Sequence, residues 1–237
     1  MNPDPIARYL QRLPTFITFF FSIALVSVFN KLSTLFNWSA GPTFDIRNLN
    51  HDLTVVGFVS TLFFVVAVWL SYCLLIERFP YTLDYTTFFF DVLRFSVLFM
   101  IFNMSFLAGA APYYGYYVAT LGVFHLIMAG WHTYRLSRIQ GEERAERAED
   151  VRGHLLRMAI YFVIAIIYYV FVAIPWKTSQ PLGLHAVIVV ITSGLLVYLN
   201  VRRLIEMKVK AGQAQEAAKA QQTQEAAKSQ PAASPSR

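Results

Sequence analysis

The residues best suited to chemistry are two charged side chains inside a strongly apolar stretch, residues 86–110. The stretch reads TTFFFDVLRFSVLFMIFNMSFLAGA and holds Asp91 and Arg94 between phenylalanine, valine and leucine residues. A charge near the middle of a membrane costs at least about 2.5–3.5 kcal/mol, so such residues usually face protein or water rather than lipid. The two charges therefore predict either a site for an ion or a proton, or an ion pair that neutralises itself.

Polar residues recur along one side of this stretch at helical spacing. The stripe consists of Asp84, Thr87, Asp91, Arg94, Leu98 and Ser105, all of them polar except Leu98. The intervals of three, four and seven residues place these side chains on one side of a helix. The next apolar stretch carries a second stripe at similar spacing, made of His125, Met128, His132 and Arg135.

The two stripes also lie at comparable depth. If the helices are consecutive and antiparallel, Arg94 and His125 both lie about 12–14 Å from the cytoplasmic end, at 1.5 Å per residue. We therefore expect Asp91, Arg94 and His125 to form a polar cluster within the membrane. Secondary candidates are Asp84, Thr87, His132 and Asn103.

This cluster has two interpretations. In the first, it is hydrated and binds an ion or a proton-coupled solute, and Asp91 or His125 changes protonation. Carboxylates and imidazoles inside membranes mark such paths. In the second, Asp91 and Arg94 pair within one helix and fix its packing, while His125 donates a hydrogen bond to a neighbouring helix. The second arrangement is the commoner one in small membrane proteins.

The composition places the chain in a membrane. Of its 237 residues, 56% are hydrophobic, 16% aromatic and only 14% charged. A soluble domain has about 45–50% apolar and about 25% charged residues. A soluble core of this size could not bury so many phenylalanine and tyrosine residues in runs. The single cysteine, Cys73, excludes an intramolecular disulfide framework and a cysteine-rich metal site.

Six apolar stretches approach the length of a membrane span, which needs about 20 residues for a hydrocarbon core about 30 Å thick. They cover residues 13–37, 53–75, 86–110, 117–134, 158–176 and 183–201. We therefore predict an all-α fold, a bundle of six transmembrane helices within residues 13–206. A short cytoplasmic segment at 1–12 precedes it.

The only long charged connection joins the fourth and fifth spans, at residues 135–157. Its core, GEERAERAEDVRG, places Glu143 and Arg147 four residues apart in the order that stabilises a helix by about 0.2–0.5 kcal/mol. We expect a solvated cytoplasmic helix here, with docking of a partner as the alternative. Residues 207–237 repeat the pattern QEAAK, which predicts a low-complexity cytoplasmic tail that is disordered or partly helical.

Lysine and arginine residues are divided unevenly between the two sides of the predicted bundle. One side carries Arg8, Arg12, Arg78, the six arginines within 135–157, Arg202, Arg203, Lys208 and Lys210. The other side carries Arg47 and Lys177, with Lys31 near its boundary. Positive charges favour the cytoplasmic side, so we expect both termini there. The small size and the lack of sorting signals favour the bacterial inner membrane.

Familiar catalytic patterns are absent from the sequence. No HExxH, GxSxG or P-loop motif occurs. Haem in a bundle needs ligands from facing helices, whereas His125 and His132 share one helix. The other histidines fall in loops or at the end of a span, namely His51, His154 and His185. We therefore expect no catalytic residue, metal site or cofactor, and a membrane enzyme ranks third among the possible functions. Three tyrosines of the fifth span could line a cavity, although such rows more often serve packing: Tyr161, Tyr168 and Tyr169.

Two functions from different classes rank above an enzyme. The first is passage of a small solute, an ion or a proton through the bundle by way of the polar cluster. The second is a non-transporting membrane sensor, effector or assembly subunit that acts through the charged connection and the tail. The expected partners are the lipid bilayer, a second copy of the chain or another membrane protein, and not nucleic acid. A polar cavity reaching Asp91 would favour passage, whereas a pair sealed by phenylalanine side chains would favour the second function.

Overall fold

A computed structural model describes residues 22, 26, 49–78, 85–139 and 142–229, and these residues form helices joined by short turns. Nearly the whole first predicted span, 13–37, lies outside the described residues, as do the segment 1–12 and Asp84. The prediction of an all-helical protein is confirmed for the described part of the chain, which contains no strand.

Long helices make up most of the described chain. In order they are α2 (Leu49–Arg78), α3 (Tyr85–Met104), α4 (Tyr114–Leu136), α5 (Glu142–Tyr168) and α7 (Leu182–Ser229). A 3₁₀ turn, η1 (Ser105–Gly109), ends α3. A π-helical turn, η2 (Tyr169–Ala173), ends α5 and is followed by the short helix α6 (Trp176–Ser179).

Within the described ranges, four helical stretches are long and apolar enough to cross a membrane. They are Leu49–Leu74, Thr86–Gly109, Arg147–Ala173 and Leu182–Val209. These four stretches are compatible with a multi-pass membrane protein, the class that the composition predicts. The fourth predicted span, 117–134, lies within α4, which is not among these four stretches and packs between α3 and α5.

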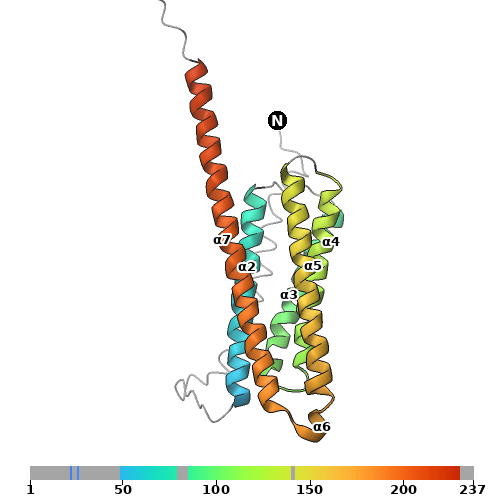
Figure 1. The fold of residues 1–237 in the computed structure, drawn as a ribbon. Coiled ribbons are helices and arrows are strands. Elements are labelled where there is room, and N and C mark those ends of the chain that lie inside the picture. Colours follow the sequence, from blue (N-terminus) through green and yellow to red (C-terminus); the bar gives the residue numbers. More distant parts are fainter. Residues whose placement is uncertain (1–21, 23–25, 27–48, 79–84, 140–141, 230–237) are drawn as a thin grey trace, which may run out of the picture.

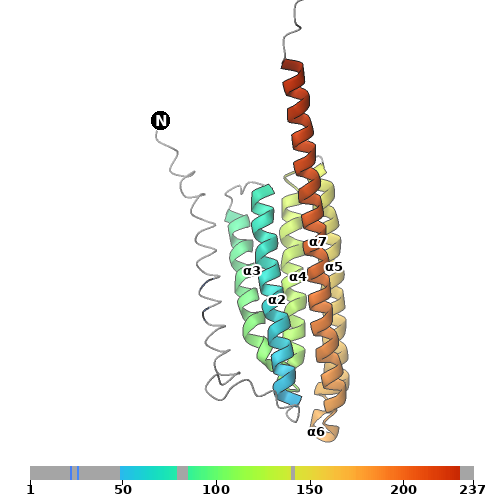
Figure 2. The same cartoon turned by 90° about the vertical axis from the view of Figure 1, so that its left-hand side faces the viewer.

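The helices run alternately up and down the bundle (Figure 1). Helix α4 packs against α5 and α3, while α2 packs against α7 and η1, and α5 also touches α7. Figure 2 shows α2 and α3 next to each other, with α7 crossing in front of α5. The turn between α4 and α5 therefore marks one end of the bundle, the α4–α5 end, and helix α6 marks the opposite end, the α6 end.

Two charged segments are parts of long helices, one at the start of α5 and the other at the end of α7. The charged stretch expected between the fourth and fifth spans forms the first turns of α5, which runs unbroken from Glu142 to Tyr168. Within it Glu149 and Arg152 are exposed, but Arg147 and His154 are buried against the bundle. Helix α7 likewise continues past the α4–α5 end to Ser229, into the region of the QEAAK repeats (Figure 1).

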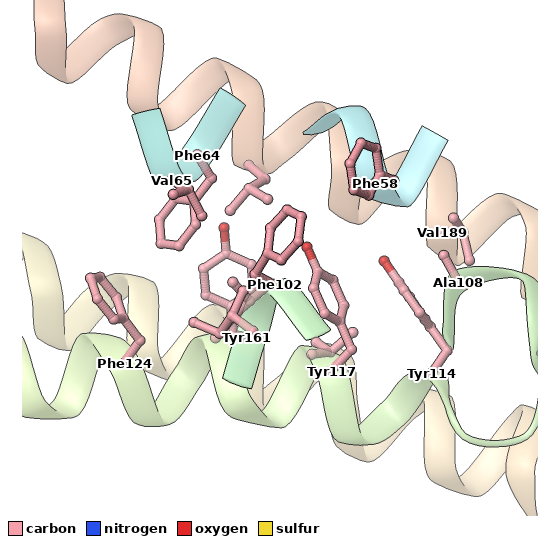
Figure 3. Close-up of a cluster of buried hydrophobic side chains, with 14 of the residues drawn as sticks. Phe58, Phe64, Val65, Phe102, Ala108, Tyr114, Tyr117, Phe124, Tyr161 and Val189 are labelled. Atoms are coloured by element: carbon pink, nitrogen blue, oxygen red, sulfur yellow. The ribbon is translucent and has the colours of Figure 1, made fainter. Parts of the chain in front are cut away.

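An aromatic and aliphatic core fills the space between the helices (Figure 3). Phe58 packs edge-on against Phe102, and Phe64 packs edge-on against Phe124, each with ring centroids 5.3 Å apart. Edge-to-face pairs of this kind contribute about 0.5–1.5 kcal/mol beyond the burial of their area. Tyrosine rings belong to the same core, so hydroxyl groups are carried into the middle of the bundle.

Gly57 marks a close approach of α2 to η1. A side-chain carbon added there would collide with Cβ of Ala108 and lie 3.1 Å from the carbonyl oxygen of Ser105. Both neighbours are fully buried, so the helices themselves would have to move apart. We expect Gly57→Ala to lower the free energy of unfolding by about 1–3 kcal/mol, the usual effect of overpacking. Unfolding in detergent, followed by circular dichroism, measures this change.

Gly194→Ala is the matched control. Gly194 lies in α7, and no atom of a neighbouring element lies within 4 Å of a carbon added there. Because alanine favours a helix over glycine by up to about 1 kcal/mol, we expect this variant to keep or raise stability. Equal effects of the two substitutions would contradict the close contact at Gly57.

Candidate functional site

Asp91 and Arg94 form a buried ion pair one turn apart on α3. Nη2 of Arg94 lies 3.3 Å from Oδ1 of Asp91, and the two side chains are 4% and 3% exposed, respectively. The guanidinium carbon of Arg94 also lies over the rings of Tyr72 and Phe95, at 4.3 Å and 4.8 Å from their centroids. Such contacts attract a cation to the face of an aromatic ring. The pair is thus covered by aromatic side chains, and its charges are balanced within one helix.

His125 of α4 faces His154 of α5 inside the bundle, and we call these two residues the histidine pair. Their Nδ1 atoms lie 3.0 Å apart, within hydrogen-bonding distance, and the side chains are buried. The other ring nitrogen of His154, Nε2, lies 3.2 Å from Nη1 of Arg203 on α7. A single chain of polar contacts therefore joins α4, α5 and α7.

His132 extends this group toward the α4–α5 end. Its ring stacks on that of His154, with centroids 5.3 Å apart and planes 22° apart. Its Nδ1 lies 3.8 Å from Oδ2 of Asp150. The side chain of His132 is fully buried, whereas that of Asp150 is 40% exposed. Asp150 therefore connects the buried imidazoles with the surface of the bundle.

Arginine side chains from several helices surround these imidazoles. Arg147 is buried and lies over the ring of Trp131, with 5.3 Å between its guanidinium carbon and the ring centroid. Arg94 interacts electrostatically with His132, and Arg157 does so with His154. Basic groups of α3, α5 and α7 thus converge on the same histidines.

Tyrosine rings continue from the histidine pair toward the α6 end. His125 stacks on Tyr161 with centroids 5.5 Å apart and only 6° between the planes. Tyr117 stacks on Tyr114 at 5.3 Å, and Tyr114 meets Tyr168 at 5.6 Å. Figure 3 shows the hydroxyl groups of Tyr114, Tyr117 and Tyr161 directed toward the side of the core formed by α2 and α7.

Hydrogen bonds hold two of the tyrosine hydroxyls. Thr61 donates its hydroxyl proton to the carbonyl oxygen of Gly57 at 2.6 Å, and its oxygen lies 2.7 Å from the hydroxyl of Tyr117. Because the single proton of Thr61 is already used, Tyr117 must be the donor to Thr61. Toward the α6 end, the hydroxyl of Tyr168 lies 2.9 Å from Nδ1 of the fully buried His185.

These side chains follow one another along the bundle, and we call the whole set the polar column. Its members are His132, His154, His125, Tyr161, Tyr117, Tyr114, Tyr168 and His185. Along α4 the rise from His132 to Tyr114 is about 27 Å at 1.5 Å per residue. The hydrocarbon core of a bilayer is about 30 Å thick. The polar column is therefore about as long as a membrane is thick.

The residues predicted to form one cluster fall into two groups. Asp91 pairs with Arg94, whereas His125 lies within hydrogen-bonding distance of His154. His132, a secondary candidate, lies between the groups and interacts with Arg94 electrostatically. The two other secondary candidates within the described residues lie on α3. Thr87 is buried, and Asn103 donates a hydrogen bond to the carbonyl oxygen of Phe99 at 2.8 Å.

His154 and Arg203 are missing from the sequence-based candidates, because both lie in or beside charged stretches. A seven-residue interval could have revealed His154. Arg147, His154, Tyr161 and Tyr168 follow one another at this interval, which keeps residues on one side of a helix, and all four are buried. Arg203 offers no comparable signal, since the neighbouring Arg202 is exposed and pairs with Glu206 on the same helix.

Within the part of the chain that the structure describes, no group of three or more His, Cys, Asp or Glu side chains is arranged to hold a metal ion. The imidazoles instead meet through ring stacking and one short nitrogen–nitrogen contact. Comparisons with family models, with curated proteins and with solved structures give no match to this chain. Its function must therefore be inferred from the geometry of the polar column.

Proposed function

We propose that this chain is a membrane protein that carries protons, alone or coupled to a small solute, through its helix bundle. The observation that carries the proposal is the polar column, whose histidine pair lies within hydrogen-bonding distance in the buried interior of the bundle. Imidazole and phenol groups can both give and take a proton. Ionisable groups at this depth are costly in a membrane and typically mark a path for ions or protons.

The proposed path begins at Asp150, which is 40% exposed and lies 3.8 Å from the buried imidazole of His132. A proton taken up there passes to the histidine pair and then along the tyrosine hydroxyls toward His185. The step from Tyr161 to Tyr117 has no direct hydrogen bond, because the hydroxyl of Tyr161 has no hydrogen-bond partner within the described residues. Crossing it requires rotation of a side chain or a transient water molecule, so we expect slow conduction rather than a wide pore.

We further propose six spans, with the first at 13–37, and a cytoplasmic α4–α5 end. The arginines of α4, α5 and α7 that lie toward the α4–α5 end support this orientation, because positive charges favour the cytoplasmic side. Both termini would then be cytoplasmic. The bacterial inner membrane is the proposed location.

A second candidate is a non-transporting sensor, effector or assembly subunit. Two observations favour it: aromatic rings cover the Asp91–Arg94 pair, and α7 continues far beyond the bundle (Figure 1). The 48 residues of α7 correspond to about 72 Å of helix, more than twice the thickness of a hydrocarbon core. In that role the projecting part of α7 would contact a cytoplasmic partner.

Purified protein in liposomes distinguishes the two candidates. The vesicles contain a pH-sensitive dye, and a potassium gradient with valinomycin supplies the driving voltage. We expect acidification or alkalinisation that follows the sign of the voltage and persists when sodium or chloride is replaced by large impermeant ions. A rate equal to that of protein-free liposomes under every gradient and added solute would contradict proton passage and favour the second candidate.

A further inference from the structure

Arg203 contacts the basic nitrogen of His154 that faces α7. Nη1 of Arg203 lies 3.2 Å from Nε2 of His154. A guanidinium group has only donors and keeps its proton in proteins. Nε2 of His154 must therefore be the acceptor, with its lone pair directed at Arg203. As long as this hydrogen bond lasts, His154 cannot carry a proton on both ring nitrogens.

The hydrogen bond from Arg203 determines which ring nitrogen carries the proton in both members of the histidine pair. A neutral His154 that accepts at Nε2 carries its proton on Nδ1. That Nδ1 lies 3.0 Å from Nδ1 of His125, so His154 donates and His125 accepts. A neutral His125 then carries its proton on Nε2. The hydrogen bonds run in one direction, from Arg203 to His154 to His125.

We propose that Arg203 is a positioning residue that sets this direction and closes the histidine pair against protons from the α4–α5 end. The inference rests on the proposed function and adds a gate to it. With Arg203 in place, the lone pairs of His154 Nε2 and His125 Nδ1 are both used in hydrogen bonds. An arriving proton finds no free basic nitrogen on the pair, and Arg203 does not release one of its own.

Withdrawal of Arg203 permits one complete proton transfer. Nε2 of His154 binds a proton from the α4–α5 end, and the N–H bond at Nδ1 of His154 breaks as that proton moves to Nδ1 of His125. His125 then releases the proton from its Nε2 to the hydroxyl oxygen of Tyr161, the next member of the polar column, and Tyr161 passes its own hydroxyl proton onward. One proton enters, one leaves and both imidazoles end neutral in the opposite tautomer. Rotation of the two rings, or reverse transfer, restores the starting arrangement.

The charges around Arg203 offer it an alternative position. Asp150 and Glu206 attract the guanidinium of Arg203, whereas Arg94 and Arg157 repel it. His132 stacks on His154, the same histidine that Arg203 contacts. The acidic neighbour of His132 is Asp150. If Arg203 moved from His154 toward Asp150, its guanidinium group would lose a neutral acceptor, the imidazole of His154. It would gain a charged acceptor, the carboxylate of Asp150.

Four proteins test the gate: wild type, Arg203→Leu, Arg203→Lys and the matched control Arg202→Leu. Arg202 is the adjacent residue on α7, exposed and paired with Glu206 at 2.8 Å, so the control removes a guanidinium without touching His154. Nitrogen NMR of protein labelled at histidine reports which ring nitrogen carries the proton. Dye-loaded liposomes report proton flux for the same samples.

In wild type we expect His154 protonated at Nδ1 and bare at Nε2. Arg203→Leu should give a mixture of tautomers and raise proton flux about tenfold, since a hydrogen bond from a charged donor biases an equilibrium by roughly that factor. Arg203→Lys supplies another cationic donor and should restore both readouts, and Arg202→Leu should change neither. If Arg203→Lys restores the tautomer and the proton flux, the effect of Arg203→Leu is due to loss of the hydrogen-bond donor and not to loss of folding.

Protonation of His154 at Nε2 in wild type, or a tautomer unchanged in Arg203→Leu, would overturn the inference. Flux that stays the same or falls in a folded Arg203→Leu protein would overturn the gate. Absence of flux from all four proteins, with a tautomer that still depends on Arg203, would instead contradict the proposed function and leave Arg203 as the residue that orders the pair.

Discussion

His154→Phe is expected to reduce proton flux to the background rate of protein-free liposomes, a loss of about 10²-fold or more if the imidazole is an obligatory proton carrier. Phenylalanine keeps a flat ring that can stack on His125 and His132, but it removes both nitrogen atoms. The hydrogen bonds to His125 and Arg203 disappear together. The measurement is the initial rate of dye response at a fixed ratio of protein to lipid.

The control for this prediction is His51→Phe. His51 lies near the start of α2, at the other end of the bundle, and its side chain is 31% exposed. The same substitution there should leave the flux unchanged. A folded His154→Phe protein with wild-type flux would remove the histidine pair from the path, even if the chain does carry protons.

Asp91→Asn is expected to lower the free energy of unfolding by about 3–5 kcal/mol. The reason is that Arg94 would stay buried beside Tyr72 and Phe95 without its carboxylate. Removal of one partner from a buried ion pair is costly because the remaining charge has lost both its counter-charge and its contact with water. Unfolding of the detergent-solubilised protein, followed by circular dichroism, gives the change.

The double variant Asp91→Asn/Arg94→Met separates structure from chemistry. Replacement of both charges should recover most of the lost stability, since a buried ion pair often contributes little more than apolar residues of similar size. If the pair only fixes helix packing, the recovered protein should also carry protons normally. Unchanged stability of Asp91→Asn together with abolished flux would contradict this account and place Asp91 on the proton path.

The helical membrane fold could be predicted from the sequence because it depends on long runs of one residue class. The helices α2 and α7 contain the predicted spans 53–75 and 183–201, and α3 together with the turn η1 covers the predicted span 86–110 as far as Gly109. Helix ends were harder to predict. The charged residues from Glu142 to Arg152 continue directly into an apolar stretch with no proline or glycine pair to separate them, so one helix, α5, contains both.

The candidate site could be predicted only in part. The depth of a residue in the membrane follows from counting residues along its helix, but the rotation of the helix about its axis does not. Counting residues from the cytoplasmic end places Arg94 and His125 at the same depth in the membrane. In the structure, however, His125 of α4 faces His154 of α5 rather than Asp91. The partner of His125 lies beside Arg152 and Arg157 in the sequence, where a histidine is expected to face solvent. Long-range packing decides that His154 is buried, and local sequence carries little information about it.

The most direct test of the central claim is a side-by-side measurement of proton flux for wild type and His154→Phe in the same liposomes under the same voltage. The account predicts a wild-type rate clearly above that of protein-free vesicles and a His154→Phe rate equal to it. A wild-type rate no higher than that of protein-free vesicles, or equal rates for the two proteins, would contradict the claim that protons cross this bundle through the histidine pair.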